Sequence, residues 1–567
     1  MKIKIRIFSL LLCLCVIMLS FSSCASYFFA VQEISDALKN QGASLKDQIQ
    51  TTPPDHNGND GLEDGALSIL ERYEYTLTEA DYDAFLDALS ACEVLVMEGT
   101  DAAVIEAAEQ AVEDLYYSIS TQANFAYLAY ATDVSNKALS EAYLFATGLS
   151  ADAYAEYAAM CQRVYASESP YKDQFFADWS EEEISDILIY DATIAEYEKQ
   201  SEAILVEYRE LTEAEFDEET GRLFLELVEC NNAIASLCGY DNYIEYAYEK
   251  GYGRDYLPTE AAVLREYVKQ ELLPLAIDFY ELFSSLYEDM SVFDQHFVYT
   301  VMAGKYSDPA TDLLTPYLAS LPESASSAMR NLFEENNVIF ADGENAKEGA
   351  FTGYLRAFGT PVCYFGPSYQ DVYTVVHELG HYYSYLAQDG GELVLDLAEL
   401  QSQGNEFLFT AFLAENQDPV YTAIVAYQLF NTVLSIVSCC IVDEFEQYVY
   451  TNEIIDPYTE LDEIMQDICD SYDGGTLTDI LDMESYWRHV VIESPVYYIS
   501  YAVSGISALE LYSYGVADFG VAAEMYVALI EGADHSKSYL EILEAAGLGS
   551  PFDASTYERI GALKAGW

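Results

Sequence analysis

The chain has 567 residues and carries 97 acidic against 24 basic side chains, which gives a formal net charge of −73. A surface this negative repels phosphate groups, so roles in nucleic-acid binding are excluded. The acidic residues are spread along the whole chain, which favours a solvated surface over a local patch that steers cationic peptides. The length is sufficient for a large core in one or two domains.

A signal peptide is predicted at the N-terminus. Basic residues at the start precede an apolar run over 8–21, which is short for a membrane span. The run ends in Phe-Ser-Ser-Cys, typical of a bacterial lipoprotein cleavage site, so we predict a signal peptide over 1–23 and lipidation of Cys24. A plain secretory signal cleaved near Cys24 is the alternative. Either way the protein is expected outside the cytoplasm, as a cell-membrane lipoprotein or a secreted protein, with the lipid anchor as its one membrane contact.

The chain after Cys24 divides into a tether and two further regions. Residues 24–65 are predicted to form the lipid anchor and a flexible tether, because the stretch from 41 onward is polar and rich in turn residues. An N-terminal helical region is predicted over 66–250, where apolar residues recur every three or four positions. The remainder, 251–567, is predicted to be the catalytic region, because it contains the motifs described next.

A small antiparallel sheet is predicted over 349–365. Aromatic and β-branched residues alternate there with glycine, threonine and proline, in contrast to the helical patterns on both sides. An exposed edge strand of such a sheet would be able to pair with an extended peptide.

The helix predicted directly after this sheet contains His377-Glu378-Leu379-Gly380-His381. Histidines four positions apart lie on the same face of a helix, so both imidazoles can bind one zinc ion. The glutamate between them is then placed as a general base beside the metal. Because the chain has only six histidines, a chance occurrence of this spacing is improbable.

A catalytic zinc site needs a third protein ligand and a position left open for water. The downstream carboxylates are Glu392, Asp396, Glu399 and Glu406. We select Glu399, because it is a single carboxylate on the apolar side of a predicted amphipathic helix. Ser402 and Glu406 follow three and seven positions later, near the same face, and are predicted to support the ligands.

The motifs resemble those of the oligoendopeptidase F and thimet oligopeptidase family of zinc metallopeptidases. Residues 371–381 resemble the family's zinc helix, and 398–406 resemble the segment whose first glutamate is the third zinc ligand. Residues 347–351 resemble a stretch that lines the substrate cleft, and 487–502 resemble a region whose histidine and tyrosines contact the substrate. The residues at the matching positions are Gly349, Ala350 and Phe351 for substrate binding, and His489, Tyr498 and Tyr501 for contacts to the substrate carbonyl and backbone.

Two departures from the family are visible. The loop between the zinc helix and the third ligand is shorter here, and a further tyrosine position of the thimet branch is Ser494. The resemblance implies a mainly α fold, with two largely helical halves around a deep substrate channel and the small antiparallel sheet beside the zinc-binding helix.

The predicted function is hydrolysis of short oligopeptides by an endopeptidase with one Zn²⁺ ion and Glu378 as general base. Short peptides are the predicted partners, and the sequence indicates no oligomeric state. The alternative is a non-catalytic, acidic, helical surface lipoprotein that binds peptides or cations.

Overall fold

The computed structural model describes residues 68–563, apart from gaps at 100, 178, 180, 190–191, 212, 305–307, 392, 474–482 and 534–536. The predicted signal peptide, the lipidation site Cys24 and the tether lie outside the described residues, as does Glu392.

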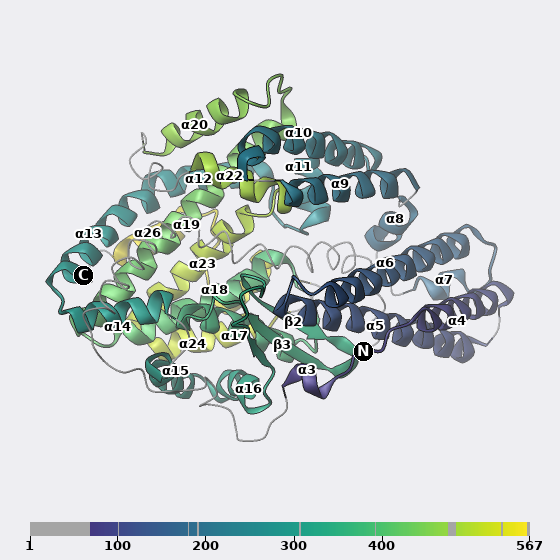
Figure 1. The fold of residues 1–567 in the computed structure, drawn as a ribbon, viewed down its shortest axis with the longest axis horizontal. Coiled ribbons are helices and arrows are strands. Elements are labelled where there is room, and N and C mark those ends of the chain that lie inside the picture. The colour runs from purple at the N-terminus through teal and green to yellow at the C-terminus, as the bar shows by residue number, and fades with distance from the viewer. Residues whose placement is uncertain are drawn as a thin grey trace.

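The N-terminal helices form an arm that extends from the rest of the molecule (Figure 1). Its three long helices are α4 (Glu79–Glu98), α5 (Ala102–Thr132) and α6 (Lys137–Ala166), which pack along one another. Gly99 ends α4 with φ +70°, and the Asp101 side chain accepts a hydrogen bond from the Ala103 N–H to begin α5. The arm has its own hydrophobic cluster. The other helices before residue 240 are α3 (Ile69–Arg72), α7 (Lys172–Phe175), α8 (Glu181–Ile189), α9 (Ala192–Glu210) and α10 (Glu213–Leu237).

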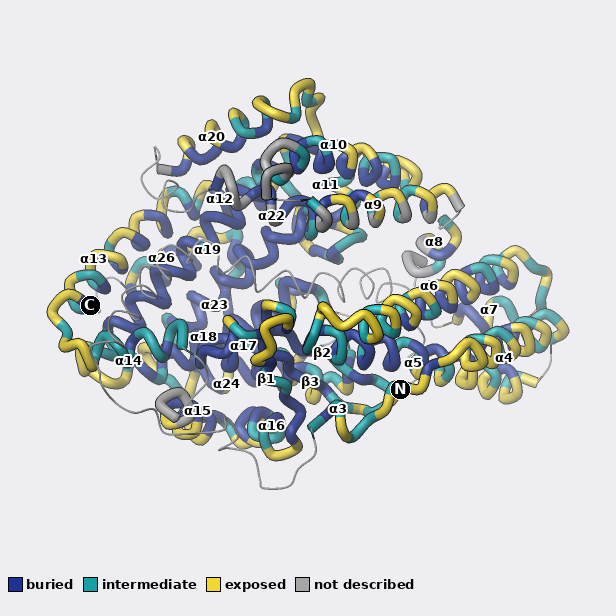
Figure 2. Tube along the Cα trace, in the orientation of Figure 1, coloured by how far each residue is buried: buried dark blue, intermediate teal, exposed yellow. Residues whose placement is uncertain are grey.

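Three helices form the centre of the larger body: α18 (Leu395–Ala414), α19 (Pro419–Thr451) and α23 (Ile499–Ala517). Figure 2 shows them buried over most of their length. By length and composition α19 could cross a membrane, but 94% of its most apolar stretch is buried inside the protein. Its apolar character is therefore explained by packing against neighbours such as α13 (Leu273–Asp289) and α23.

Shorter helices surround this centre. Before the sheet they are α11 (Tyr243–Tyr246), the π-helix η1 (Ala247–Gly251), α12 (Pro258–Tyr267), the π-helix η2 (Val268–Leu272), α14 (Val292–Ala303), α15 (Asp308–Ser320) and α16 (Glu323–Glu334). After it they are α17 (Val372–Ala387), α20 (Glu460–Asp473), α22 (Met483–Glu493), α24 (Phe519–Glu531), α25 (Tyr539–Ala546) and α26 (Ala554–Gly561).

Among the described residues the sheet has three strands in the order β1-β3-β2, which makes β2 an edge strand of this set. The predicted antiparallel pair is confirmed: β2 (Ala350–Leu355) and β3 (Thr360–Phe365) are joined through the short 3₁₀ helix η3 (Arg356–Phe358), with Gly359 at φ +61°. The sheet as a whole is mixed, however, because β1 (Val338–Phe340) pairs parallel to β3. That strand is three residues long, and a run so short has no alternating pattern that identifies it in the sequence.

The sheet lies between α17 and α5 (Figure 1). This packing of the sheet against both helices joins the arm to the larger body. Tyr364 and Val362 of β3 pack with the α5 side, while Cys363 and Phe365 belong to the main hydrophobic cluster. The mainly α fold with a small sheet beside the motif helix is confirmed. The division at residue 250 and the deep channel stay predictions.

Candidate active site

The two motif histidines lie on α17, and the helix holds them between core and solvent. The Asp371 side chain begins the helix by accepting a hydrogen bond from the Thr374 N–H at 3.0 Å. Val375, Val376 and Leu379 are fully buried. On the other face, the side chains of His377 and His381 are 13% and 18% exposed, enough for a ligand to reach them.

Glu399 of α18 meets both histidines. Its Oε2 atom lies 3.7 Å from Nε2 of His377 and 3.8 Å from Nε2 of His381. One ligand atom from each of the three residues lies within 4.8 Å of the others. Zinc bonds of ~2.0–2.1 Å in a tetrahedral site place neighbouring ligand atoms roughly 3.3 Å apart. The three side chains therefore fit one metal ion with little movement.

A glycine allows α17 and α18 to approach this closely. A Cβ atom at Gly380 would lie 2.5 Å from the Gln401 carbonyl oxygen and 2.7 Å from the Ser402 Cα atom. Any larger residue at 380 would push the helices apart, and with them the histidines and Glu399.

Polar contacts orient the candidate metal ligands. They include contacts from Ser402 and Glu406, the two residues predicted to support those ligands. Nδ1 of His377 lies 2.7 Å from Oε1 of Glu406, which leaves Nε2 to face Glu399. Gln428 of α19 donates to the other Glu406 oxygen at 2.9 Å. The Ser402 hydroxyl lies 3.2 Å from Oε2 of Glu399. Such contacts fix the tautomer and direction of a metal-binding imidazole.

Burial and charge shift the ligands' pKa values in opposite directions. Burial by itself lowers the pKa of His377, but the hydrogen bond and charge of Glu406 outweigh it and raise that pKa to about 9. Burial and the charge of His377 lower the pKa of His381 well below its ordinary value. Burial raises the pKa of Glu399. A divalent cation favours neutral imidazole and ionised carboxylate, so this cluster is one whose charges a metal ion would balance.

Glu378 points away from solvent toward the sheet. It is 1% exposed, and its Oε2 atom accepts a hydrogen bond from the Thr352 hydroxyl of β2 at 2.7 Å. The general base predicted from the motif is thus held by the edge strand.

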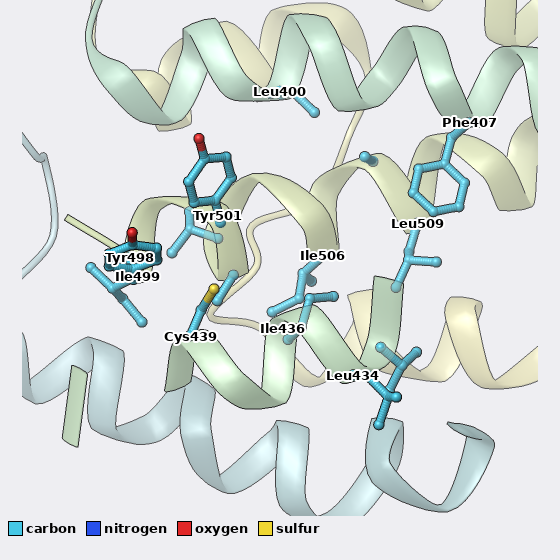
Figure 3. Close-up of a cluster of buried hydrophobic side chains, with 14 of the residues drawn as sticks. Leu400, Phe407, Leu434, Ile436, Cys439, Tyr498, Ile499, Tyr501, Ile506 and Leu509 are labelled. Carbon is cyan, nitrogen blue, oxygen red and sulfur yellow. The ribbon is translucent and has the colours of Figure 1, made fainter. Parts of the chain in front are cut away.

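The tyrosines of the 497–501 segment lie beside Glu399. The Tyr497 hydroxyl is 3.4 Å from Oε1 of Glu399 and 3.4 Å from the Tyr501 hydroxyl. Hydrogen bonds from Tyr501 and Tyr497 favour the ionised form of Glu399. Figure 3 shows Tyr501 on α23 with its hydroxyl directed toward α18. Tyr498 precedes the first turn of α23, with its ring centre 6.2 Å from that of Tyr501.

His489 lies on α22, and its side chain is outside what the structure describes. Ser494, which replaces the expected tyrosine, is fully buried.

A buried clamp holds the turn before these tyrosines. We use this name for Tyr252, Arg254 and Glu446 around the backbone of Pro495 and Val496. Arg254 donates to the Val496 carbonyl at 2.7 Å, and the Val496 N–H donates to Glu446 at 2.7 Å. The Tyr252 hydroxyl donates to the Pro495 carbonyl at 2.7 Å. Val496 has φ +60°, a conformation that a β-branched residue adopts only when its surroundings impose it.

The remaining carboxylate candidate, Asp396, belongs to this same buried region and lies apart from the metal ligands. Its Oδ1 atom is 3.4 Å from the Tyr256 hydroxyl, and the positive charge of Arg254 lies near enough to act on its pKa. Burial nevertheless raises the pKa of Asp396.

The predicted substrate-binding residues lie at the start of β2 and directly before it. Gly349 has φ +107°, and its carbonyl accepts from the Gly366 N–H. That bond sets a register in which the backbone groups of Ala350 and Thr352 face away from β3. The Phe351 side chain is buried against Tyr364 and Tyr127, with ring centres 4.9 and 5.5 Å away, and its backbone groups face Tyr364 on β3 in the same register.

Two residues at the site were missed by sequence reasoning. Thr352 lies one position beyond the stretch that resembles the family, and Tyr497 lies between matched positions. A polar residue in a predicted apolar strand was the available signal for Thr352. No sequence signal singled out Tyr497, because the neighbouring Tyr498 is also a tyrosine.

The fold is shared with solved peptidase structures. PZ peptidase A with an inhibitor matches with a TM-score of 0.67 and 18% identity, over 88% of this chain and 98% of that one. Oligoendopeptidase F from Enterococcus faecium matches with a TM-score of 0.57 and 14% identity, over 86% of this chain and 96% of that one. M32 carboxypeptidase from Deinococcus radiodurans R1 matches with a TM-score of 0.51 and 12% identity, over 80% of this chain and 97% of that one. No protein-family model and no curated protein sequence matches. The resemblance seen in the motifs is therefore confirmed as a likeness of fold.

Proposed function

We propose that the chain is a zinc-dependent endopeptidase of the oligoendopeptidase F family that hydrolyses short oligopeptides. The observation that carries the proposal is the convergence of His377, His381 and Glu399 beside Glu378. Two imidazoles and one carboxylate are a donor set suited to zinc, and they leave room for a water molecule. A bound Zn²⁺ ion supplies Lewis acidity, which makes water a better nucleophile near neutral pH and polarises the scissile carbonyl.

Glu378 is assigned the proton transfers. Its carboxylate takes the proton of the attacking water and passes it to the leaving amine, a role that typically contributes ~10²–10⁴-fold. Tyr501 and Tyr498, with His489, are assigned hydrogen bonds to the carbonyl oxygen as negative charge develops. Tyr497 and Tyr501 both form hydrogen bonds to Glu399, so both are also assigned the role of holding the third ligand.

The edge of β2 that faces away from β3 is assigned to the substrate backbone. Ala350 and Thr352 direct their N–H and C=O groups toward that edge, so an extended peptide would add to the sheet as a further strand. Backbone pairing tolerates many side chains, which suits an enzyme that trims peptides of varied sequence. This arrangement also agrees with the buried position of the Phe351 side chain.

The proposal keeps the extracytoplasmic location, with lipidation at Cys24. Cys24→Ser in the producing cell is expected to abolish incorporation of a labelled fatty acid into the protein. Incorporation of label by the variant would contradict lipidation at Cys24.

The test is hydrolysis of quenched fluorescent peptides of graded length by the protein from Ala25 onward, beside Glu378→Gln. The wild type is expected to cleave short peptides and to lose rate as length increases. The variant is expected to hold zinc equally well and to lose roughly 100–10,000-fold in kcat. An active Glu378→Gln variant would contradict the assigned base.

The second candidate function is a binding lipoprotein without catalysis, which the strongly acidic composition favours. Peptide or cation binding without turnover, by a wild type that contains no stoichiometric zinc, would support it over the peptidase. Zinc content measured on the same samples separates the two outcomes.

A further inference from the structure

Thr352 is a polar residue in the buried part of β2. Its side chain faces α17, while its neighbour Phe351 faces the aromatic cluster on the other side of the sheet. The residue is 8% exposed. Its Oγ1 atom lies 2.7 Å from Oε2 of Glu378 and 3.2 Å from Sγ of Cys363, the residue paired with it on β3.

The distances favour the Glu378 carboxylate as acceptor of the Thr352 hydroxyl, since Oε2 lies at 2.7 Å and the Glu378 backbone carbonyl oxygen at 3.3 Å. Burial raises the pKa of the Cys363 thiol well above its ordinary value, so the thiol remains protonated and acts as a donor. The short contact to Glu378 is a charge-assisted one in which the hydroxyl donates to the carboxylate. The thiol has two acceptors within reach, Oγ1 of Thr352 and the Glu378 backbone carbonyl oxygen, which lies 3.8 Å from Sγ. The Thr352 hydroxyl therefore links the Glu378 carboxylate directly to β2.

We infer that Thr352 is a positioning residue for the general base, which ties the orientation of Glu378 to the edge strand where the peptide binds. The hydroxyl holds Oε2 and so sets the orientation of the carboxylate that takes the proton from water. Because Thr352 belongs to the strand whose backbone would pair with the substrate, the base and the scissile bond are kept in register. This inference rests on the proposed function.

A purely structural role for Thr352 makes a different prediction. If the side chain only filled space, valine, which has the same shape, would replace it without consequence for catalysis. If the hydroxyl orients Glu378, valine leaves a buried carboxylate oxygen without its donor, whereas serine retains the donor at the same place.

The experiment compares Thr352→Val, Thr352→Ser and a matched control, Thr220→Val. Thr220 of α10 is fully buried, and its hydroxyl donates to the Phe216 carbonyl within that helix. Thr352→Val is expected to lower kcat by about 10–100-fold with KM within about 3-fold, as for other contacts that orient catalytic groups. Thr352→Ser should stay within about 3-fold of the wild-type kcat, and Thr220→Val should be unchanged. If the valine variant fails to fold, Thr352→Ala replaces it with the same expectation.

Crystal structures of metal-free wild type and Thr352→Val provide a readout that does not depend on turnover. The inference expects the Glu378 carboxylate to leave its position beside β2 in the variant. An unmoved carboxylate, or a valine variant at the wild-type kcat while the wild type is active, overturns the inference alone. A wild type that cleaves no peptide, or whose rate is unchanged by Glu378→Gln, overturns the proposed function and this inference together.

Discussion

The two halves of the candidate site are built in different ways. The half that contains the candidate metal ligands lies on two regular helices, where His377 and His381 share a face and Glu399 approaches across Gly380. The half that carries the tyrosines depends on the clamp, in which Arg254 contacts residues more than 240 positions away in the chain. Its turn also contains Val496 in a left-handed conformation.

The contrast shows how each half depends on the rest of the molecule. A helical metal site needs local spacing and one close helix contact, so substitutions that weaken the core affect it little. The tyrosine segment needs buried charged groups, whose removal leaves other polar groups without partners. We therefore expect the half that carries the tyrosines, which depends on the clamp, to be the more fragile of the two. Four experiments test this comparison of the two halves.

The largest effect is expected from removal of the metal. Dialysis against a chelator should reduce peptide hydrolysis to background, and added Zn²⁺ should restore it, because the remaining side chains cannot activate water alone. His381→Ala should not recover, since it lacks one ligand. Metal content and rate, measured together, check this. Full activity of chelated wild type would show that the first half of the site has been misassigned.

The next largest effect is expected at Arg254, which is 7% exposed and lies between the rings of Tyr248 and Tyr252, each about 4.5 Å away. Arg254→Met should lower the free energy of unfolding by roughly 2–4 kcal/mol, because the carbonyls of Val496 and Tyr497 lose a buried charged donor. Urea unfolding measures it.

Arg222→Met is the matched control for Arg254→Met. Arg222 contacts Glu207, Glu219 and Glu226, but its side chain is 32% exposed. Solvent screens such pairs, so its loss should cost less than about 1 kcal/mol. Equal effects of the two substitutions would remove the distinction between a buried clamp and a surface network.

A pH dependence is expected in the metal-binding half. The folded pKa of His377 is about 9, above the ordinary value of 6.5. The protonated histidine therefore stabilises metal-free protein fully below about pH 6.5, and this stabilisation, about 3 kcal/mol, is lost as pH rises through about 9. Urea unfolding at several pH values measures it. Glu406→Gln should flatten the dependence, and an equally steep curve for that variant would exclude Glu406 as its cause.

The smallest effect is expected from Val496→Gly. Glycine relieves a left-handed strain of ~1–2 kcal/mol, which offsets much of the ~1.5–3 kcal/mol lost with the buried side chain. The net loss should be about 1 kcal/mol, the balance of those two contributions.

Val437→Gly, at a fully buried helical position in α19, has no strain to relieve and should cost about 3 kcal/mol. Denaturant unfolding compares the two valine variants. A larger loss at 496 than at 437 would mean that the turn is not strained.

The sequence by itself determined the parts of this protein that depend on local spacing. The interval between His377 and His381 places both imidazoles on one helix face, and the interval from Glu399 to Glu406 spans two turns of the next helix. The helical periodicity and the β2–β3 pair were likewise readable, because hydrophobic patterns of period 3.6 and 2 follow from backbone geometry. The predicted ligand set needed only these periods and the metal's preference for donors.

Only the tertiary structure decided which distant residues support that site. Arg254 and Glu446 look like ordinary surface residues in the sequence, since nothing local indicates that they meet at Val496. Thr352 contacts Glu378 because β2 packs on α17, and Tyr497 reaches Glu399 because α23 packs on α18. Contacts of this kind arise from the packing of elements far apart in the chain. Local spacing fixes the direction of a side chain on its own helix or strand, and the fold determines what that side chain meets.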